Sequence, residues 1–390
     1  MRSWWKRVAG AGLAWLALGA QAQHSVSFIE ASKAWGSVVA DFNRDGHDDI
    51  FITGHDTDDR IWYWTPKGYV PAAQTFVWVD RHDCDAADIN RDGLPDLYCA
   101  IGADRGEGEG PNEVWLQDAS GQFQLMASHG AEDRYGSGRL PVFFDFNHDG
   151  WPDIYLSNER RTRTDGQLSI NRVFVNQAGT GFVEANTIAT GERGSACVAK
   201  GDIDQDGWDD LIVCDLSGPP HIYLNNRAGD FTELAAPAVA QKWVAAKLAD
   251  MNRDGWLDLV VIAEGNNLQI WLNTGGGTYF EAPVYQNHLL FMGKAITVGD
   301  FNRDGWQDVY VVLMKSGCQE TLVDEAPDLV FQGNAAGGWS KLKLLQQDYG
   351  GCGHLADTVD GHDVLLMNGG ISWVGPNYLL SWVPRLVSPD

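Results

Sequence analysis

Residues 41–49 read Asp-Phe-Asn-Arg-Asp-Gly-His-Asp-Asp, and the same placement of Asp, Asn and Gly returns five more times along the chain. Side chains that carry oxygen occupy positions 1, 3, 5 and 9 of this nine-residue segment, and Gly occupies position 6. A recurrence at intervals of about 50 residues is typical of repeat proteins, in which each repeat is one structural unit. Successive copies are 47 to 57 residues apart and begin at Asp41, Asp88, Asp145, Asp202, Asp250 and Asp300.

Short apolar runs flank every copy and predict β-strands. Residues 36–40 precede the first copy and residues 49–53 follow it, and both runs are rich in Val and Ile. A third run, as at 268–272, and a fourth run after a Gly-rich turn, as at 230–234, complete the unit. Runs of this length, bounded by turn residues, are typical of strands. Four antiparallel strands repeated radially describe a propeller blade.

The number of units predicts the architecture. A degenerate seventh copy retains Asp357, Asp360 and Asp363, but it is two residues shorter and lacks the Asn. Residues 24–31 resemble the fourth-strand segment 230–233, so we expect them to complete the last blade and close the ring. Closure removes exposed sheet edges. We therefore predict an all-β, seven-bladed β-propeller of four-stranded antiparallel blades, with residues 23–390 as a single domain.

The first residues predict export. Arg2, Lys6 and Arg7 precede an apolar run over 8–19, and Ala20-Gln21-Ala22 has the form of a cleavage site. This arrangement predicts a signal peptide over 1–22 and a secreted or periplasmic protein. The net charge of −25 argues against nucleic acid and anionic lipid as partners, since both need a cationic surface. We expect a monomer with no membrane span.

Six cysteines in an exported chain predict disulfides. Cys84 and Cys99 flank the second copy, and Cys197 and Cys214 flank the fourth. In both pairs the sum of the two residue numbers has the same offset, one less than the sum for the first and last residues of the copy. Equal offsets are what two cross-strand disulfides in equivalent hairpins require. Cys318 and Cys352 remain to pair between blades.

The acidic segments predict metal sites. Oxygen ligands at alternate positions suit a hard cation, and the Gly permits the sharp bend that brings them together. An EF-hand needs its last acid at position 12 and flanking helices, whereas here the acid stands at position 9 between strands. Because Ca²⁺ accepts six to eight oxygens, we expect about six Ca²⁺ sites and a degenerate seventh. An acidic turn without metal explains one copy but not six. The candidate ligands are Asp41, Asn43, Asp45, Asp49; Asp88, Asn90, Asp92, Asp96; Asp145, Asn147, Asp149, Asp153; Asp202, Asp204, Asp206, Asp210; Asp250, Asn252, Asp254, Asp258; and Asp300, Asn302, Asp304, Asp308.

Six copies of D-x-[ND]-x-D-G-x-x-D between strands resemble the FG-GAP/VCBS repeat family, which includes integrin α-subunit propellers and many bacterial secreted proteins. The resemblance spans residues 23 to about 370. It implies a seven-bladed β-propeller with Ca²⁺ in the loop that joins the first two strands of a blade. The metal roles carry over to the Asp and Asn positions given above. The family hosts several functions and does not supply a ligand.

The sequence contains no catalytic motif, so enzymatic activity stays undecided. The ten His residues are scattered, and no G-x-S-x-G occurs. Trp151, Trp208, Trp256 and Trp306 all stand at position 7 of a loop, where we expect them to pack. Trp62, Trp64, Trp115 and Trp271 fall in third strands, where we expect them to be buried between blades.

The loops between second and third strands vary most, and variable loops on a rigid scaffold often bind ligands. One of them carries Arg160, Arg161 and Arg163, a possible cationic ligand patch. The leading hypothesis is a binding or adhesion module for a protein or glycan. The alternatives are an extracellular carbohydrate-active enzyme with a pocket at the propeller axis and a structural subunit of a cell-envelope complex.

Overall fold

The structure is a computed structural model, and its described part lies between residues 23 and 383. Within these bounds it describes all residues except 33, 55–57, 78, 103–109, 160–161, 164, 191–194, 216, 236–241, 276–279, 290–291, 315–328, 344–352, 362 and 369–374. The predicted signal peptide, Arg160, Arg161, Cys318 and Cys352 therefore lie outside the described residues.

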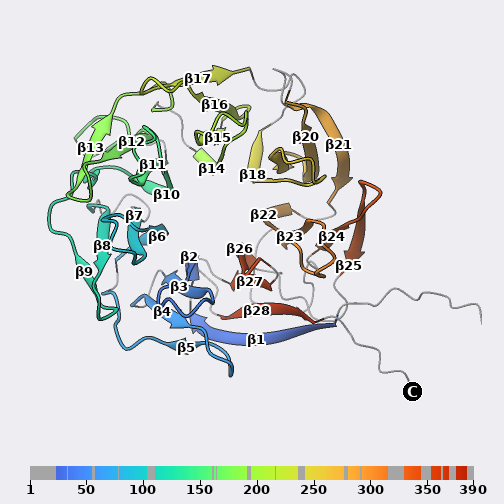
Figure 1. The fold of residues 1–390 in the computed structure, drawn as a ribbon, viewed down its shortest axis with the longest axis horizontal. Coiled ribbons are helices and arrows are strands. Elements are labelled where there is room, and N and C mark those ends of the chain that lie inside the picture. Colours follow the sequence, from blue (N-terminus) through green and yellow to red (C-terminus); the bar gives the residue numbers. More distant parts are fainter. Residues whose placement is uncertain are drawn as a thin grey trace, which may run out of the picture.

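The described residues form an all-β propeller of four-stranded antiparallel blades. Seven such sheets are present, and in Figure 1 they surround a central axis, with each inner strand near the axis and each outer strand at the rim. In chain order, from inner to outer strand, the sheets are β2 (Ala34–Ala40), β3 (Asp49–Gly54), β4 (Arg60–Tyr63), β5 (Val70–Pro71); β6 (Arg81–Ala87), β7 (Asp96–Ile101), β8 (Glu113–Gln117), β9 (Phe123–Leu125); β10 (Gly138–Phe144), β11 (Asp153–Asn158), β12 (Arg172–Asn176), β13 (Phe182–Ala185); β14 (Ser195–Gly201), β15 (Asp210–Asp215), β16 (His221–Asn225), β17 (Phe231–Leu234); β18 (Trp243–Ala249), β19 (Asp258–Ala263), β20 (Asn267–Asn273), β21 (Phe280–His288); β22 (Met292–Gly299), β23 (Asp308–Met314), β24 (Leu329–Gly333), β25 (Trp339–Lys343); and β26 (Gly353–Val359), β27 (Asp363–Asn368), β28 (Gly375–Val383), β1 (Gln23–Ser32).

The seventh sheet joins the two ends of the described chain. β1 pairs antiparallel with β28, with His24 opposite Trp382 and Phe28 opposite Tyr378. β1 is thus the outer strand of a sheet whose other three strands come from the end of the chain (Figure 1).

Second strands form the core of each blade because both of their faces are covered by neighbouring blades. All residues of β7, β11, β15 and β19 are buried. In β11, Ile154 and Leu156 pack with the preceding blade, and Tyr155 between them packs with the following one. Burial on both faces explains why these strands read as continuous apolar runs rather than as alternating ones.

The four tryptophans expected between blades differ in their burial and in what they contact. Trp62 and Trp271 are buried, and Trp115 packs against the apolar cluster between the first two blades. Trp64 lies one residue beyond β4 and stacks on the His47 ring at 3.6 Å, so it contacts a loop rather than the core.

The structure contains the Cys84–Cys99 and Cys197–Cys214 disulfides. In both pairs the two cysteines lie directly opposite each other on the first two strands of a blade, in equivalent registers. The equal sequence offsets predicted this placement.

The seventh acidic segment differs from its predicted register. Val359 pairs with Asp363, which leaves three residues in the connection between β26 and β27. In the first blade Ala40 pairs with Asp49, which leaves eight. Asp357 lies within β26 and not in a loop, so the predicted alignment of this copy is wrong. The missing residues shorten the loop to a turn at Asp360 and Gly361.

Candidate metal centres

The six acidic loops share one hydrogen-bond pattern, which the second loop illustrates. The Asp88 carboxylate accepts the backbone N–H of Asp92 at 3.0 Å and of Gly93 at 2.8 Å. Asn90 Oδ1 also accepts the Asp92 N–H, and Asp92 Oδ1 accepts the Leu94 N–H, both at 2.9 Å. The equivalent four bonds recur in all six loops, at 2.8–3.2 Å. The side chains at positions 1, 3 and 5 therefore turn toward the inside of each loop.

Two residues of each loop have left-handed backbone. The Gly at position 6 has φ of 81° to 89°, as the sequence predicted from its freedom to bend. Position 4 also has positive φ, between 56° and 64°, although it carries Arg, His or Gln. Sequence reasoning missed this position, because residues with a β-carbon rarely adopt this conformation and no side-chain type announces it.

The Asp at position 9 anchors each loop to its blade. Asp96 is fully buried, and its two oxygens accept the N–H of Ile89 at 2.9 Å and of Gln117 at 2.7 Å. One bond thus holds the loop and the other holds the end of the third strand. The same double contact recurs at Asp153, Asp210, Asp258 and Asp308, and at Asp49 the loop donor is instead the Asn43 N–H, one position further along.

These buried carboxylates lack a positive partner among the described residues that contact them. Burial raises the pKa of Asp49 and Asp258 to about 6, and that of Asp96, Asp153, Asp210 and Asp308 to about 7. The backbone N–H donors lower these pKa values, whereas the carboxylate at position 5 raises them further. A site that gathers oxygen donors around uncompensated negative charge fits a hard cation such as Ca²⁺.

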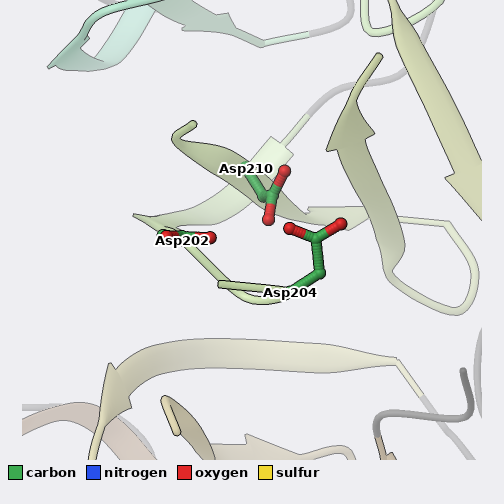
Figure 2. Close-up of side chains that lie close together, drawn as sticks. All are labelled: Asp202, Asp204 and Asp210. Atoms are coloured by element: carbon green, nitrogen blue, oxygen red, sulfur yellow. The ribbon is translucent and has the colours of Figure 1, made fainter. Parts of the chain in front are cut away.

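The fourth loop gathers the most carboxylates. Oxygens of Asp202, Asp204 and Asp210 all lie within 4.8 Å of one another, and Figure 2 shows the three side chains around a common space. Asp204 stands at position 3, where the other five loops have Asn. The donor set is oxygen throughout, with no sulfur or imidazole among the candidate ligands.

Neighbouring loops contact one another through position 4. The Arg91 guanidinium lies 4.3 Å from the centre of the Trp151 ring and donates to the Asp149 and Gly150 carbonyls of the next loop at 3.0 and 3.1 Å. In the next pair, His148 stacks on Trp208 at 4.8 Å. The half-buried tryptophans at position 7 thus pack against the loop that precedes them.

The same direction of contact continues around the ring. Gln205 donates to the Gly255 carbonyl at 2.9 Å, and Arg253 lies 5.3 Å from the Trp306 ring centre. The short turn of the seventh sheet takes part as well. Asp360 has φ of 49° and accepts the Asp48 N–H at 3.1 Å, while its own N–H donates to Asp48 Oδ2 at 2.8 Å. The seventh turn therefore keeps the contact while lacking the acidic loop.

A second set of contacts ties four of the six loops to the following blade. Asn176 donates its amide to the Ile89 carbonyl at 3.0 Å, and Asn225 donates to the Phe146 carbonyl at 2.8 Å. Gln117 and Asn273 make the equivalent bonds to Phe42 and Ile203. All four amides are buried. The residue at position 2 of a loop is thus held by the third strand of the next blade.

Of the three arginines in the predicted cationic patch, only Arg163 lies among the described residues. Its guanidinium pairs with Asp165 at 2.7 Å and lies 5.4 Å from the Tyr135 ring centre. The Arg163 side chain is 9% exposed, so it is largely covered. In the described part of the chain, no helix is long and apolar enough to cross a membrane.

Together the fold and the loops define a β-propeller that carries a repeated acidic, oxygen-rich loop. The FG-GAP-like repeat family matches residues 41–99, 88–156, 202–261 and 250–311, which is more than half of the chain. The chain belongs to the FG-GAP-like repeat family.

Two kinds of relatives agree with this assignment. Integrin alpha-3 of Cricetulus griseus is 23% identical over 223 residues, which are 48% of this chain and 21% of the relative. The chain thus spans about a fifth of the length of that curated relative. The solved structure of BBS1N in complex with ARL6DN, soaked with mercury, covers 94% of this chain and 98% of its own, with a TM-score of 0.59 and 12% identity. A lead-soaked form of the same complex covers 93% of this chain and 95% of its own, with a TM-score of 0.56 and 12% identity. At this identity the solved structures show the fold alone.

Proposed function

We propose that this protein is an exported, calcium-stabilised β-propeller that acts as a binding module for a protein or glycan. The observation that carries the metal assignment is the repetition of one loop geometry six times, each with a buried position-9 Asp whose pKa is raised. Crowded carboxylates repel one another, and a bound divalent cation supplies the positive charge that offsets this repulsion. Side chains at positions 1, 3, 5 and 9 of the six loops would hold the ions.

The seven sheets would then act as the blades of one closed ring, with β1 as the outer strand of the seventh. Its pairing with β28 and the reciprocal Asp48–Asp360 contact support closure between the first and last blades. The connection at Asp360 has three residues where the first blade has eight, so we assign no metal to it. Six ions per chain follow from this assignment.

Export is proposed from three features. Residues 1–22 have the order of a signal peptide. The two disulfides are typical of oxidising compartments, and the acidic surface suits a soluble secreted or periplasmic protein. Residues 23–390 would form the mature protein as a single propeller domain.

Ligand binding is proposed for the face opposite the acidic loops. In an antiparallel blade the connection between the second and third strands leaves the sheet at the other end from the loop between the first two. Those connections differ most among the blades, while the acidic loops are nearly constant. A propeller of the same fold, BBS1N, was crystallised in complex with a second protein, which agrees with a binding role for such a scaffold.

Thermal unfolding with and without metal tests the calcium assignment. A cation that binds the folded state alone stabilises it by mass action. We expect excess EDTA to lower Tm by more than about 10 °C and Ca²⁺ to restore it, with Mg²⁺ restoring less. An unchanged Tm in EDTA would refute the assignment. A glycan array and a pull-down with the calcium-loaded protein would then identify the ligand class.

A further inference from the structure

The fourth loop departs from four of the other loops in how its position-5 Asp is held. In the second, third, fifth and sixth loops, the position-3 Asn donates its amide to Oδ2 of the position-5 Asp at 2.8–3.0 Å. In the fourth loop position 3 is Asp204, whose carboxylate cannot donate this bond when ionised. Asp206 Oδ2 therefore lacks the amide donor that the equivalent oxygen has in those four loops.

Arg227 supplies that donor. Its Nε lies 2.7 Å and its Nη2 2.6 Å from Asp206 Oδ2, the oxygen equivalent to the one that receives the Asn amide in those four loops. Arg227 comes from the turn between β16 and β17, at the same end of the blade as the fourth loop. Its side chain is 53% exposed, whereas that of Asp206 is 9% exposed. The guanidinium thus approaches the loop from the solvent side.

The backbone that carries Arg227 does not depend on the side chain. Arg227 has φ of 58°, and Ala178 has φ of 52° in the equivalent turn between β12 and β13. The third blade thus makes this turn with Ala. Replacing Arg227 with Ala should therefore leave the turn intact.

Charge makes the exchange significant. The four carboxylates at the candidate ligand positions of the fourth loop and the Arg227 guanidinium together carry −3, which is the charge of the three Asp and one Asn at the same positions in each of the other five loops. The negative charge added by Asp204 is offset by the positive charge of Arg227. Arg227 thus restores both the hydrogen bond and the charge that the Asn would have given.

We propose that Arg227 is the built-in counter-ion of the fourth loop and sets the affinity of that loop for a divalent cation. This inference rests on the proposed calcium binding. Arg227→Ala leaves four unpaired carboxylates and should tighten Ca²⁺ binding at this loop. Asp204→Asn leaves the guanidinium beside only three carboxylates and should weaken it. The double variant recreates the composition of the other loops and should bind like the wild-type protein.

One unit of charge beside a divalent cation, screened as at a water-exposed loop, changes affinity by about tenfold. We therefore expect the fourth-loop midpoint to fall about tenfold in free Ca²⁺ for Arg227→Ala, and to rise about tenfold for Asp204→Asn. The double variant should return to within about threefold of wild type. If Arg227 only stabilised the fold, Arg227→Ala would weaken Ca²⁺ binding at the fourth loop. The tighter binding expected here therefore distinguishes a counter-ion from a structural role.

Hydrogen exchange with mass spectrometry can read each loop separately. The N–H groups of Asp206 and Gly207 donate to Asp202, so their protection against exchange in the 202–210 segment should report occupancy of the fourth loop. The protein is titrated with CaCl₂ in a chelator buffer, and the equivalent segments of the other five loops serve as internal controls. Arg253→Ala is the matched control variant, because Arg253 stacks on Trp306 rather than on a carboxylate.

The outcomes separate the two proposals. A fourth-loop midpoint that falls in Arg227→Ala, with the other five unchanged, supports the counter-ion assignment. A midpoint that is unchanged or rises overturns it. If no loop of the wild-type protein responds to Ca²⁺, the proposed calcium function fails, whatever Arg227 does.

Discussion

The stability of the metal-free protein should increase as the solution is acidified from pH 8 to pH 5. The position-9 carboxylates have raised pKa values in the folded protein, about 7 for Asp96, Asp153, Asp210 and Asp308, against 3.8 when unperturbed. A raised folded pKa means that the folded state binds more protons between these pH values. The stability contributed by each group is therefore present below about pH 4 and lost as the pH rises through about 7.

The magnitude is large enough to measure. A shift from 3.8 to about 7 corresponds to about 4 kcal/mol for one fully coupled group. Even a quarter of that value in each of the six loops amounts to about 6 kcal/mol, which is comparable to the whole stability of a domain. His129 acts in the opposite direction, since burial lowers its pKa and acid must charge it, but it is a single group.

Thermal unfolding by circular dichroism between pH 5 and 8, in EDTA and in excess Ca²⁺, measures this dependence. In EDTA we expect Tm to rise as the pH falls. In Ca²⁺ the sign should reverse, because protons compete with the metal for the same carboxylates. A metal-free Tm that falls steadily from pH 8 to pH 5 would refute the reasoning about the buried Asp residues.

Three further predictions concern what holds the ring together. Replacing Cys84 and Cys99 with Ala should lower the free energy of unfolding by about 3 kcal/mol, since this disulfide closes a loop of about 15 residues. Urea unfolding measures the loss, with the reduced wild-type protein as the control. Asn225→Ala should cost about 1–3 kcal/mol, because it leaves the buried Phe146 carbonyl without its donor. Urea unfolding measures this, and an unchanged free energy of unfolding would contradict the contact. Removing residues 23–32 should uncover the edge of β28 and produce dimers or larger species by size-exclusion chromatography, whereas a stable monomer would contradict the role of β1.

The sequence predicted the fold well because the acidic loop fixes where each first strand ends and each second strand begins. Asp49, Asp96 and their equivalents start the second strands at the expected residues. The cysteine offsets then gave the register of two hairpins directly. The predicted alignment of the seventh copy is wrong, because it makes Asp357 the first residue of a loop, whereas Asp357 lies within β26.

The contacts between loops could not be predicted in the same way. The residue at position 4 varies among Arg, His and Gln, so its shared left-handed backbone leaves no pattern in side-chain type. Arg227 is about twenty residues from the Asp206 that it neutralises, and only the blade geometry brings them together. Asp204 was visible as an exception at position 3, but its compensating partner was not.

A crystal structure of the mature protein grown in CaCl₂ tests the central claim most directly. The account predicts an anomalous scatterer in each of the six acidic loops, with oxygen ligands at about 2.3–2.6 Å, and none at the Asp360 turn. Loops that contain only water at millimolar Ca²⁺, with the hydrogen bonds of the position-9 Asp residues unchanged, would contradict it.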